Sequence, residues 1–193
     1  MGRYYHTKES VDEYIKMAQG HDGKDAITRL KEHLPVGSRL LEIGSGPGTD
    51  WKLLQEHYKV TGSDNSKEFL KHLHENYPEG KFLKLDAASL NIKGSYDGIY
   101  SNKVLHHLED EALIWSVKRQ YEILGPGGIV CHTFWHGKDS EVYNDLFVNY
   151  HTDEGIGILF GEYFDHKLFH FYKEFEKADS FLYIGQKRKG LST

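Results

Sequence analysis

The stretch Leu40-Leu41-Glu42-Ile43-Gly44-Ser45-Gly46-Pro47-Gly48 joins a short apolar run to a loop that contains three glycines. Trp51, Leu53 and Leu54 follow it at helical spacing, so the pattern predicts a strand, a glycine-rich loop and a helix. Glycines lack the Cβ atom that would hold a ligand away from the backbone, and the start of the following helix offers free N–H groups. We therefore expect the loop to hold a ligand with an anionic end. A merely tight turn is the alternative.

Strands and helices alternate on both sides of this stretch. We expect further strands at residues 58–62, 81–85, 96–101 and 129–134, and helices at 10–19, 23–34, 66–77 and 109–124. Ser10 is expected to cap the first of these helices, because Glu13 stands three residues later as in a capping box. Such alternation is typical of a parallel sheet that helices cover on both faces.

The last sixty or so residues are less regular. Residues 180–186 alternate like a closing strand. A helix is suggested by apolar residues at helical spacing, namely Phe164, Leu168, Phe171, Tyr172 and Phe175.

Composition excludes several classes of function. The 193 residues predict one domain, and the net charge of −5 leaves no global basic field, so no nucleic-acid partner is expected. Cys131 is the single cysteine, which rules out an internal disulfide and a multi-thiolate zinc site. The histidine pairs His132/His136 and His166/His170 lack the glutamate of a metalloprotease helix, so no metal is expected. With neither a signal-peptide pattern nor an apolar run near 18 residues, we expect a soluble cytoplasmic protein without a membrane partner.

The glycine pattern does not fit a dinucleotide site well. In Gly-x-Gly-x-x-Gly the third glycine would stand one position later, where this chain has Thr49, and no Gly-Lys-Ser/Thr follows as in a phosphate loop. Asp64 ends the second strand, 20 residues after Gly44, where a carboxylate can accept hydrogen bonds from both hydroxyls of a ribose. Asp86 follows the third strand and could accept from an exocyclic amine. Either aspartate alone could be a helix cap, but together they predict a nucleoside site.

At this point the chain resembles the class I S-adenosylmethionine-dependent methyltransferases of the broad small-molecule type. The resemblance covers about residues 36–134 in five ordered motifs. They are Leu40–Gly48, Val60–Asp64, Leu85–Ala87, Tyr96–Asn102 with Val104–Leu108, and Leu124–Gly128.

The resemblance implies S-adenosylmethionine as cofactor and S-adenosylhomocysteine as product. It assigns the methionyl ammonium and carboxylate to Glu42 and the backbone of the loop, with Gly44, Ser45, Gly46 and Gly48. It assigns the ribose to Asp64, the adenine to Asp86 and Ala87 with Asn65 beside it, and the methionyl end to the backbone of Asn102.

The implied fold is an α/β, Rossmann-like, doubly wound sheet in the order 3-2-1-4-5-7-6, mostly parallel with an antiparallel last strand. Because few residues remain after the last predicted helix, we expect strand 6 to be short or missing. One domain would span residues 1–193, with a helical lid at 1–34, a cofactor-binding core at 36–134, and a substrate-side insert with the closing strand at 135–193. The aromatic residues of the lid and insert would wall a pocket, or else form core or a dimer face: Tyr4, Tyr5, Trp135, Tyr143, Phe147, Tyr150, Phe160, Tyr163 and Phe164.

Methyl transfer from a sulfonium is an in-line displacement, which depends mainly on holding the two reacting atoms close together. A base is needed only when the acceptor still carries its proton at neutral pH. His106 and His107 follow the fourth strand and are candidates for that base, although a structural role for both is the alternative.

The expected acceptor is an O, N or C nucleophile of a small molecule. Nucleic-acid bases are disfavoured, because Ser101-Asn102-Lys103-Val104 lacks the Asn/Asp-Pro-Pro-aromatic motif of base-modifying relatives. A non-catalytic nucleoside-binding regulator of the same fold and an NAD-linked oxidoreductase remain as alternatives. The chain is expected to be a monomer or a homodimer.

Overall fold

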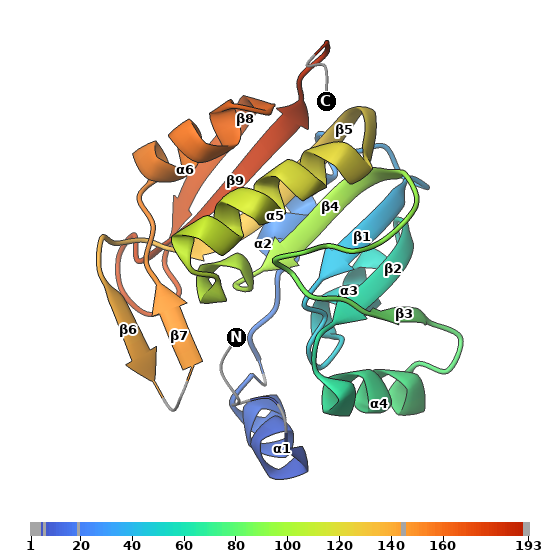
Figure 1. Ribbon diagram of the computed structural model, residues 1–193. Helices are drawn as coiled ribbons and strands as arrows, with labels where there is room; N and C mark the ends of the chain where they lie inside the picture. The colour runs from blue at the N-terminus through green and yellow to red at the C-terminus, as the bar shows by residue number, and fades with distance from the viewer. Residues whose placement is uncertain (1–4, 6, 19, 144–145, 191–193) are drawn as a thin grey trace.

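The computed structural model describes residues 5, 7–18, 20–143 and 146–190. Figure 1 shows a central twisted sheet with helices on both of its faces. The first half of the chain forms α1 (Lys8–Met17), α2 (Lys24–Leu30), β1 (Arg39–Ile43), α3 (Thr49–Leu54), β2 (Lys59–Asp64), α4 (Lys67–Asn76), β3 (Lys81–Lys84) and β4 (Tyr96–Asn102). The second half forms the short 3-10 helix η2 (Leu105–His107), α5 (Asp110–Ile123), β5 (Leu124–Trp135), β6 (Ser140–Tyr143), β7 (Leu146–Asn149), α6 (Asp153–Gly161), β8 (Phe164–Tyr172) and β9 (Ser180–Lys187).

The main sheet has the order β3-β2-β1-β4-β5-β9-β8. The pairs among β1 to β5 are parallel, whereas β9 runs antiparallel to β5 and β8 runs antiparallel to β9. The expected fold class and strand order are therefore confirmed, with β8 in the place of strand 6 and β9 in the place of strand 7. The expectation that strand 6 is short or missing is wrong, because β8 is nine residues long and pairs along the whole of β9.

The core lies in two layers, one on each face of the sheet. Neighbouring residues of a strand point to opposite faces, so Leu40 packs with α2 and α3 while Leu41 packs with α5 and α6. Both leucines are completely buried. Cys131 lies in the layer next to α2, where burial raises the pKa of its thiol, as expected for an inert cysteine.

Three sequence predictions of helices need correction. The first helix begins at Lys8 rather than after Ser10, because the hydroxyl oxygen of Thr7 accepts from the Ser10 amide and caps the helix earlier. Helix α2 ends at Leu30, and residues 31–34 form turns. The helix suggested around residues 164–175 is β8, because pairing with β9 outweighs the local helical spacing.

The region after β5 contains elements that the sequence pattern did not resolve. Strands β6 and β7 form a separate hairpin, seen at the lower left of Figure 1, and α6 packs against α5 and β8. Phe160 and Phe164 are fully buried core residues rather than walls of a pocket. Tyr4 lies outside the described residues.

Strands β1, β2 and β4 are parallel, so their carboxyl ends meet at one edge of the sheet. The glycine loop leaves β1 at this edge, Asp64 ends β2, and Asn102 ends β4. The N-terminal segment crosses the same edge, because the Gly23 amide donates to Asp50 at the start of α3. In the described part of the chain, no helix is long and apolar enough to cross a membrane.

Candidate active site

A cavity of about 210 Å³ opens at the carboxyl edge of the sheet. Its walls come from the N-terminal segment, the glycine loop, the ends of β2 and β4, and the turn between β8 and β9. Of the residues predicted from the sequence, the following line it: Glu42, Gly44, Ser45, Gly46, Asp64, Asn65, Ala87, Asn102 and His107. Gly48, Asp86 and His106 belong to the same region, but they do not line the cavity.

The glycine loop has the backbone conformation that its composition predicts. Gly44, Gly46 and Gly48 all have positive φ angles, of 70°, 48° and 86°. A Cβ atom on Gly44 would lie 2.5 Å from Cγ2 of Val104, whereas one on Gly46 would meet nothing within 4 Å. The loop therefore presents its backbone at Gly46 to open space, as a site for an anionic group requires.

Glu42 lies beneath this loop and is 2% exposed. Its carboxylate accepts a 2.6 Å hydrogen bond from Ser45, and the Ser45 hydroxyl oxygen accepts from the Ser63 amide at 3.1 Å. Burial raises the pKa of Glu42 to about 8, so this carboxyl is mostly protonated at pH 7 in the absence of a ligand. A ligand ammonium beside it would favour the ionised form.

Asp64 connects the glycine loop to the start of α4. One carboxylate oxygen accepts from the Gly46 amide at 3.0 Å, and the other accepts from the Ser66 amide at 2.8 Å. Burial raises the pKa of Asp64 in spite of these bonds. The carboxylate thus faces the cavity from a fixed position.

Asp86 is engaged in a local turn. Its Oδ1 accepts from the backbone amides of Ala88 and Ser89 at 2.7 and 3.2 Å, and Oδ2 accepts from the side-chain nitrogen of Asn65 at 3.4 Å. These bonds hold the chain so that Ala87, directly after Asp86, lines the cavity. Its placement beside a bound adenine stays a prediction.

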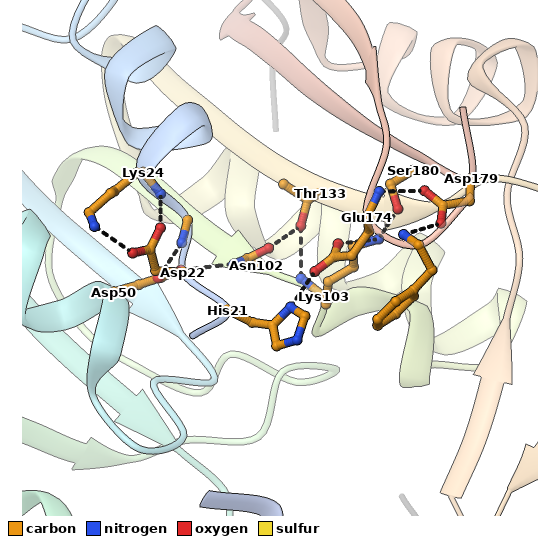
Figure 2. Close-up of polar contacts among 12 residues, drawn as sticks. His21, Asp22, Lys24, Asp50, Asn102, Lys103, Thr133, Glu174, Asp179 and Ser180 are labelled. Carbon is orange, nitrogen blue, oxygen red and sulfur yellow. Dashed lines mark hydrogen bonds and ion pairs between the residues drawn. The ribbon is translucent and has the colours of Figure 1, made fainter. Parts of the chain in front are cut away.

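Asp50 was not predicted as a site residue, yet it joins three segments at the cavity. Its carboxylate accepts from the Gly23 amide at 2.7 Å, the Tyr100 hydroxyl at 2.7 Å and the Asn102 side-chain amide at 3.0 Å. The Asn102 oxygen in turn accepts from Thr133 at 2.5 Å, as Figure 2 shows. Burial raises the pKa of Asp50.

A second group of polar residues lies beyond Asn102. Figure 2 places Lys103 and Glu174 on the side of Asn102 opposite to Asp50. The Lys103 ammonium lies 3.5 Å from one Glu174 oxygen, and His21 Nδ1 lies 3.7 Å from the other. All three residues line the cavity. Sequence reasoning missed them because they come from three distant segments.

The two candidate bases have different surroundings. His106 is 2% exposed, its Nδ1 has no hydrogen-bond partner, and it does not line the cavity, so its role as a base stays a prediction. His107 Nδ1 lies 2.7 Å from the Phe147 carbonyl oxygen. Since a carbonyl can only accept, Nδ1 carries the proton and Nε2 keeps its lone pair. Burial lowers the pKa of His107, so the ring is neutral at pH 7.

No cluster of three or more potential metal ligands occurs among the residues that the structure describes. Of the aromatic residues predicted to wall a pocket, Tyr5 alone is among the described residues that line the cavity. The other predicted aromatic residues lie elsewhere or have side chains that the structure does not describe. Tyr14, Phe69 and Leu146 line the cavity instead.

Part of the chain is similar in sequence to known methyltransferases. A family model described as a methyltransferase domain matches residues 40–128. The chain is 32% identical over 101 residues to a trans-aconitate 2-methyltransferase of Variovorax paradoxus, covering 50% of this chain and 38% of that protein. It is 31% identical over 112 residues to a 2-methyl-6-phytyl-1,4-hydroquinone methyltransferase of Synechocystis, covering 55% of this chain and 35% of that protein. The chain thus spans less than half the length of these curated relatives.

Solved structures extend the likeness of the fold to nearly the whole chain. The 1,6-didemethyltoxoflavin-N1-methyltransferase of Burkholderia thailandensis, with bound 1,6-didemethyltoxoflavin and S-adenosylhomocysteine, matches with a TM-score of 0.77 and 18% identity, over 96% of this chain and 84% of that one. The N-methyltransferase NodS of Bradyrhizobium japonicum, in complex with S-adenosylhomocysteine, matches with a TM-score of 0.70 and 17% identity, over 88% and 90% of the two chains. Residues 40–128 are thus similar to a methyltransferase domain, and the chain shares its fold with these two solved methyltransferases.

Proposed function

We propose that this chain is an enzyme that transfers a methyl group from S-adenosylmethionine to a small organic acceptor. The observation that carries this proposal is the cavity itself, in which the glycine loop, Glu42, Asp64 and Asn102 meet at the carboxyl edge of the sheet. The bound cofactor would supply an electrophilic methyl group on a sulfonium. The named relatives act on small molecules, which supports an acceptor of that size.

The residues of the cavity divide the work between cofactor and acceptor. Glu42 and the open backbone at Gly46 would bind the charged methionyl end, and Asp64 would accept from the ribose hydroxyls. Asn65 and Ala87 would border the adenine, with Asp86 shaping the turn beneath it. The methionyl end would contact the backbone of Asn102, which Asp50 and Thr133 hold in place through its side chain.

The acceptor would enter from the side formed by Tyr14, Leu146 and Glu174, which come from the N-terminal segment, β7 and the β8–β9 turn. Apolar and aromatic lining there would exclude water from the displacement. For an acceptor that carries its proton at pH 7, we propose His107 Nε2 as the base, because its tautomer is fixed by Phe147.

Thermal unfolding with separate additions of S-adenosylmethionine, S-adenosylhomocysteine and NAD tests the proposal. A ligand at 100 times its dissociation constant stabilises the protein by about 2.7 kcal/mol, so the two adenosyl compounds should raise Tm and NAD should not. Stabilisation by NAD alone would favour the oxidoreductase. Binding of the adenosyl compounds without formation of S-adenosylhomocysteine from S-adenosylmethionine in the presence of any acceptor in a broad screen would favour a regulatory protein.

Asp64→Ala is expected to weaken the binding of S-adenosylhomocysteine by about 1–3 kcal/mol, the scale of lost hydrogen bonds to a charged group. Isothermal titration calorimetry measures the change. Asp97→Ala is a suitable control, because Asp97 pairs with Arg39 at the opposite end of the strands. Equal affinities of wild type and Asp64→Ala would remove the ribose assignment.

His107→Asn is expected to lower the rate of methyl transfer by about 10²–10⁴-fold for an acceptor that must lose a proton. Asparagine places an N–H near the position of Nδ1 and can keep the bond to Phe147, but it offers no basic nitrogen at the position of Nε2. The rate is measured as formation of S-adenosylhomocysteine from S-adenosylmethionine in the presence of an acceptor found in the screen, and exposed His166→Asn is the control. An unchanged rate would leave proximity alone as the source of catalysis.

A further inference from the structure

Lys103 is the one lysine or arginine among the described residues that line the cavity. It follows Asn102 directly at the end of β4. Its backbone has a φ of 55°, which is uncommon for a residue other than glycine. The Lys103 amide donates to Thr133 Oγ1 at 2.9 Å, and Thr133 in turn donates to Asn102. The network that holds Asn102 therefore also fixes the direction in which the Lys103 side chain leaves the strand.

The ammonium of Lys103 is largely removed from solvent, since its side chain is 14% exposed. It donates to Ser180 Oγ at 2.6 Å and to the Phe134 carbonyl at 3.3 Å, and it lies 3.3 Å from the centre of the Trp135 ring. Burial lowers the pKa of Lys103 to about 8, so the group still carries its charge at pH 7. A buried lysine normally needs an anionic partner.

The available partner, Glu174, is held at a longer distance. The 3.5 Å between Lys103 Nζ and the nearer Glu174 oxygen exceeds the usual 2.7–3.2 Å of an N–H···O hydrogen bond. Glu174 cannot simply move closer with its backbone, because Asp179 accepts from the amides of Glu174, Phe175 and Glu176 at 2.7–2.9 Å and fixes the turn. The third N–H of the ammonium thus has only a long contact, on the side of the cavity.

The other charges of the cavity lie mostly at the cofactor end. Asp22 and Asp50 lie on the far side of Asn102 in Figure 2, and Glu42 and Asp64 border the glycine loop. Lys103 therefore places a positive charge at the acceptor end, where Glu174 is its counter-charge. A carboxylate group on a small molecule could supply the short hydrogen bond to the third N–H that Glu174 does not make.

We propose that Lys103 determines acceptor specificity by binding a carboxylate group of the acceptor, and that Glu174 balances its charge while no acceptor is bound. The inference rests on the proposed function and names the acceptor class for the same cavity. Substitutions at the two residues should have opposite effects on the binding of a carboxylate. Loss of the Lys103 charge removes the attraction for a carboxylate, whereas loss of the Glu174 charge removes a competitor that repels it.

The test uses two probes of nearly equal shape, phenylacetate and its neutral analogue phenylacetamide. Both are titrated by ligand-detected NMR into wild type, Lys103→Met and Glu174→Gln, each saturated with S-adenosylhomocysteine. In wild type, phenylacetate should bind more tightly than the amide. Lys103→Met should weaken phenylacetate about tenfold and leave the amide within about twofold, and Glu174→Gln should strengthen phenylacetate about threefold, as expected for single charged contacts that are partly exposed.

Several outcomes would overturn the inference: no binding of phenylacetate to wild type, equal weakening of both probes by Lys103→Met, or weaker phenylacetate binding to Glu174→Gln. If Lys103→Met does not fold, the sign of the Glu174→Gln effect decides alone. Calorimetry with S-adenosylhomocysteine separates the two proposals. A wild type that binds it but shows no preference for phenylacetate rejects the carboxylate subsite, whereas a wild type that fails to bind it rejects the proposed function.

Discussion

Asp50→Ala is expected to destabilise the protein by about 3–5 kcal/mol, because it leaves three donors without their acceptor and an unsatisfied buried donor costs about 1–3 kcal/mol. The Asp50 side chain accepts from three donors that lie on different segments, namely Gly23, Tyr100 and Asn102. Tyr100 is completely buried, so its hydroxyl would have no access to water as a replacement partner. The three losses occur together because a single carboxylate serves all three donors.

The same substitution should also weaken cofactor binding, because Asn102 would lose one of the two bonds that orient its side chain. Urea unfolding at pH 7 measures the stability, and calorimetry with S-adenosylhomocysteine measures the affinity. Asp12→Ala is a matched control, since Asp12 lies exposed on α1 and should change stability by less than about 0.5 kcal/mol. Asp50→Asn, which keeps the shape but opposes one donor with its own amide group, should be intermediate. A loss below about 1 kcal/mol for Asp50→Ala would contradict the role given to this network.

The sequence predicted the cofactor half of the fold because its signals there are local. Gly44, Gly46 and Gly48 mark backbone with positive φ directly after β1, and β2 and β4 end in the polar residues Asp64 and Asn102 at the carboxyl edge. Each of these features depends on residues that are close in the chain. Parallel pairing then brings the strand ends together without further information.

The last third of the chain was harder to predict, since its structure depends on distant partners. Apolar residues in the β8 segment, from Phe164 onward, recur at a spacing that also fits a helix. Pairing with β9 is what makes this segment a strand. The glycines of α6 gave no clear helix signal either. The spacing of apolar residues within one segment does not show whether a distant strand will pair with that segment.

The acceptor side of the site illustrates the same limit. Lys103 stood beside Asn102 in a recognised motif, but the partners of its ammonium come from β5, the β8–β9 turn and β9. Asp50 closely follows the glycine loop in sequence, yet one of the donors to its carboxylate is Tyr100, which lies 50 residues further along the chain. In both cases the sequence shows a charged residue next to a motif. The contacts that assign this residue to the site are visible only in the folded structure.

His132 is expected to make the protein lose stability as the pH falls below about 6.5. The ring is fully buried, with Nδ1 2.8 Å from Ser101 Oγ and Nε2 2.7 Å from Gln120 Oε1. Because an amide oxygen only accepts, Nε2 carries the single proton and Ser101 donates to Nδ1. Burial lowers the pKa of His132 from its ordinary 6.5 to about 3.

The sign of the effect follows from proton binding. Between pH 6.5 and 3 the unfolded chain binds a proton at His132 and the folded chain does not, so the free energy of unfolding falls by up to about 1.4 kcal/mol per pH unit on acidification. Over that window the contribution of this residue amounts to several kcal/mol. Other groups titrate in the same range: His106 and His107, with lowered pKa values, add to the loss, whereas Glu42, with its pKa raised to about 8, opposes it.

A comparison with His132→Gln isolates the contribution of this ring. The variant should be less stable than wild type at pH 7, because glutamine fills the site less well, but it has no proton to gain on acidification. Urea unfolding at pH 7, 6, 5 and 4 should therefore show the difference between the two proteins shrinking as the pH falls, while the shared contributions of His106, His107 and Glu42 cancel. Parallel stability profiles would mean that His132 binds its proton equally well in the folded and unfolded states, and the buried neutral tautomer would have to be abandoned.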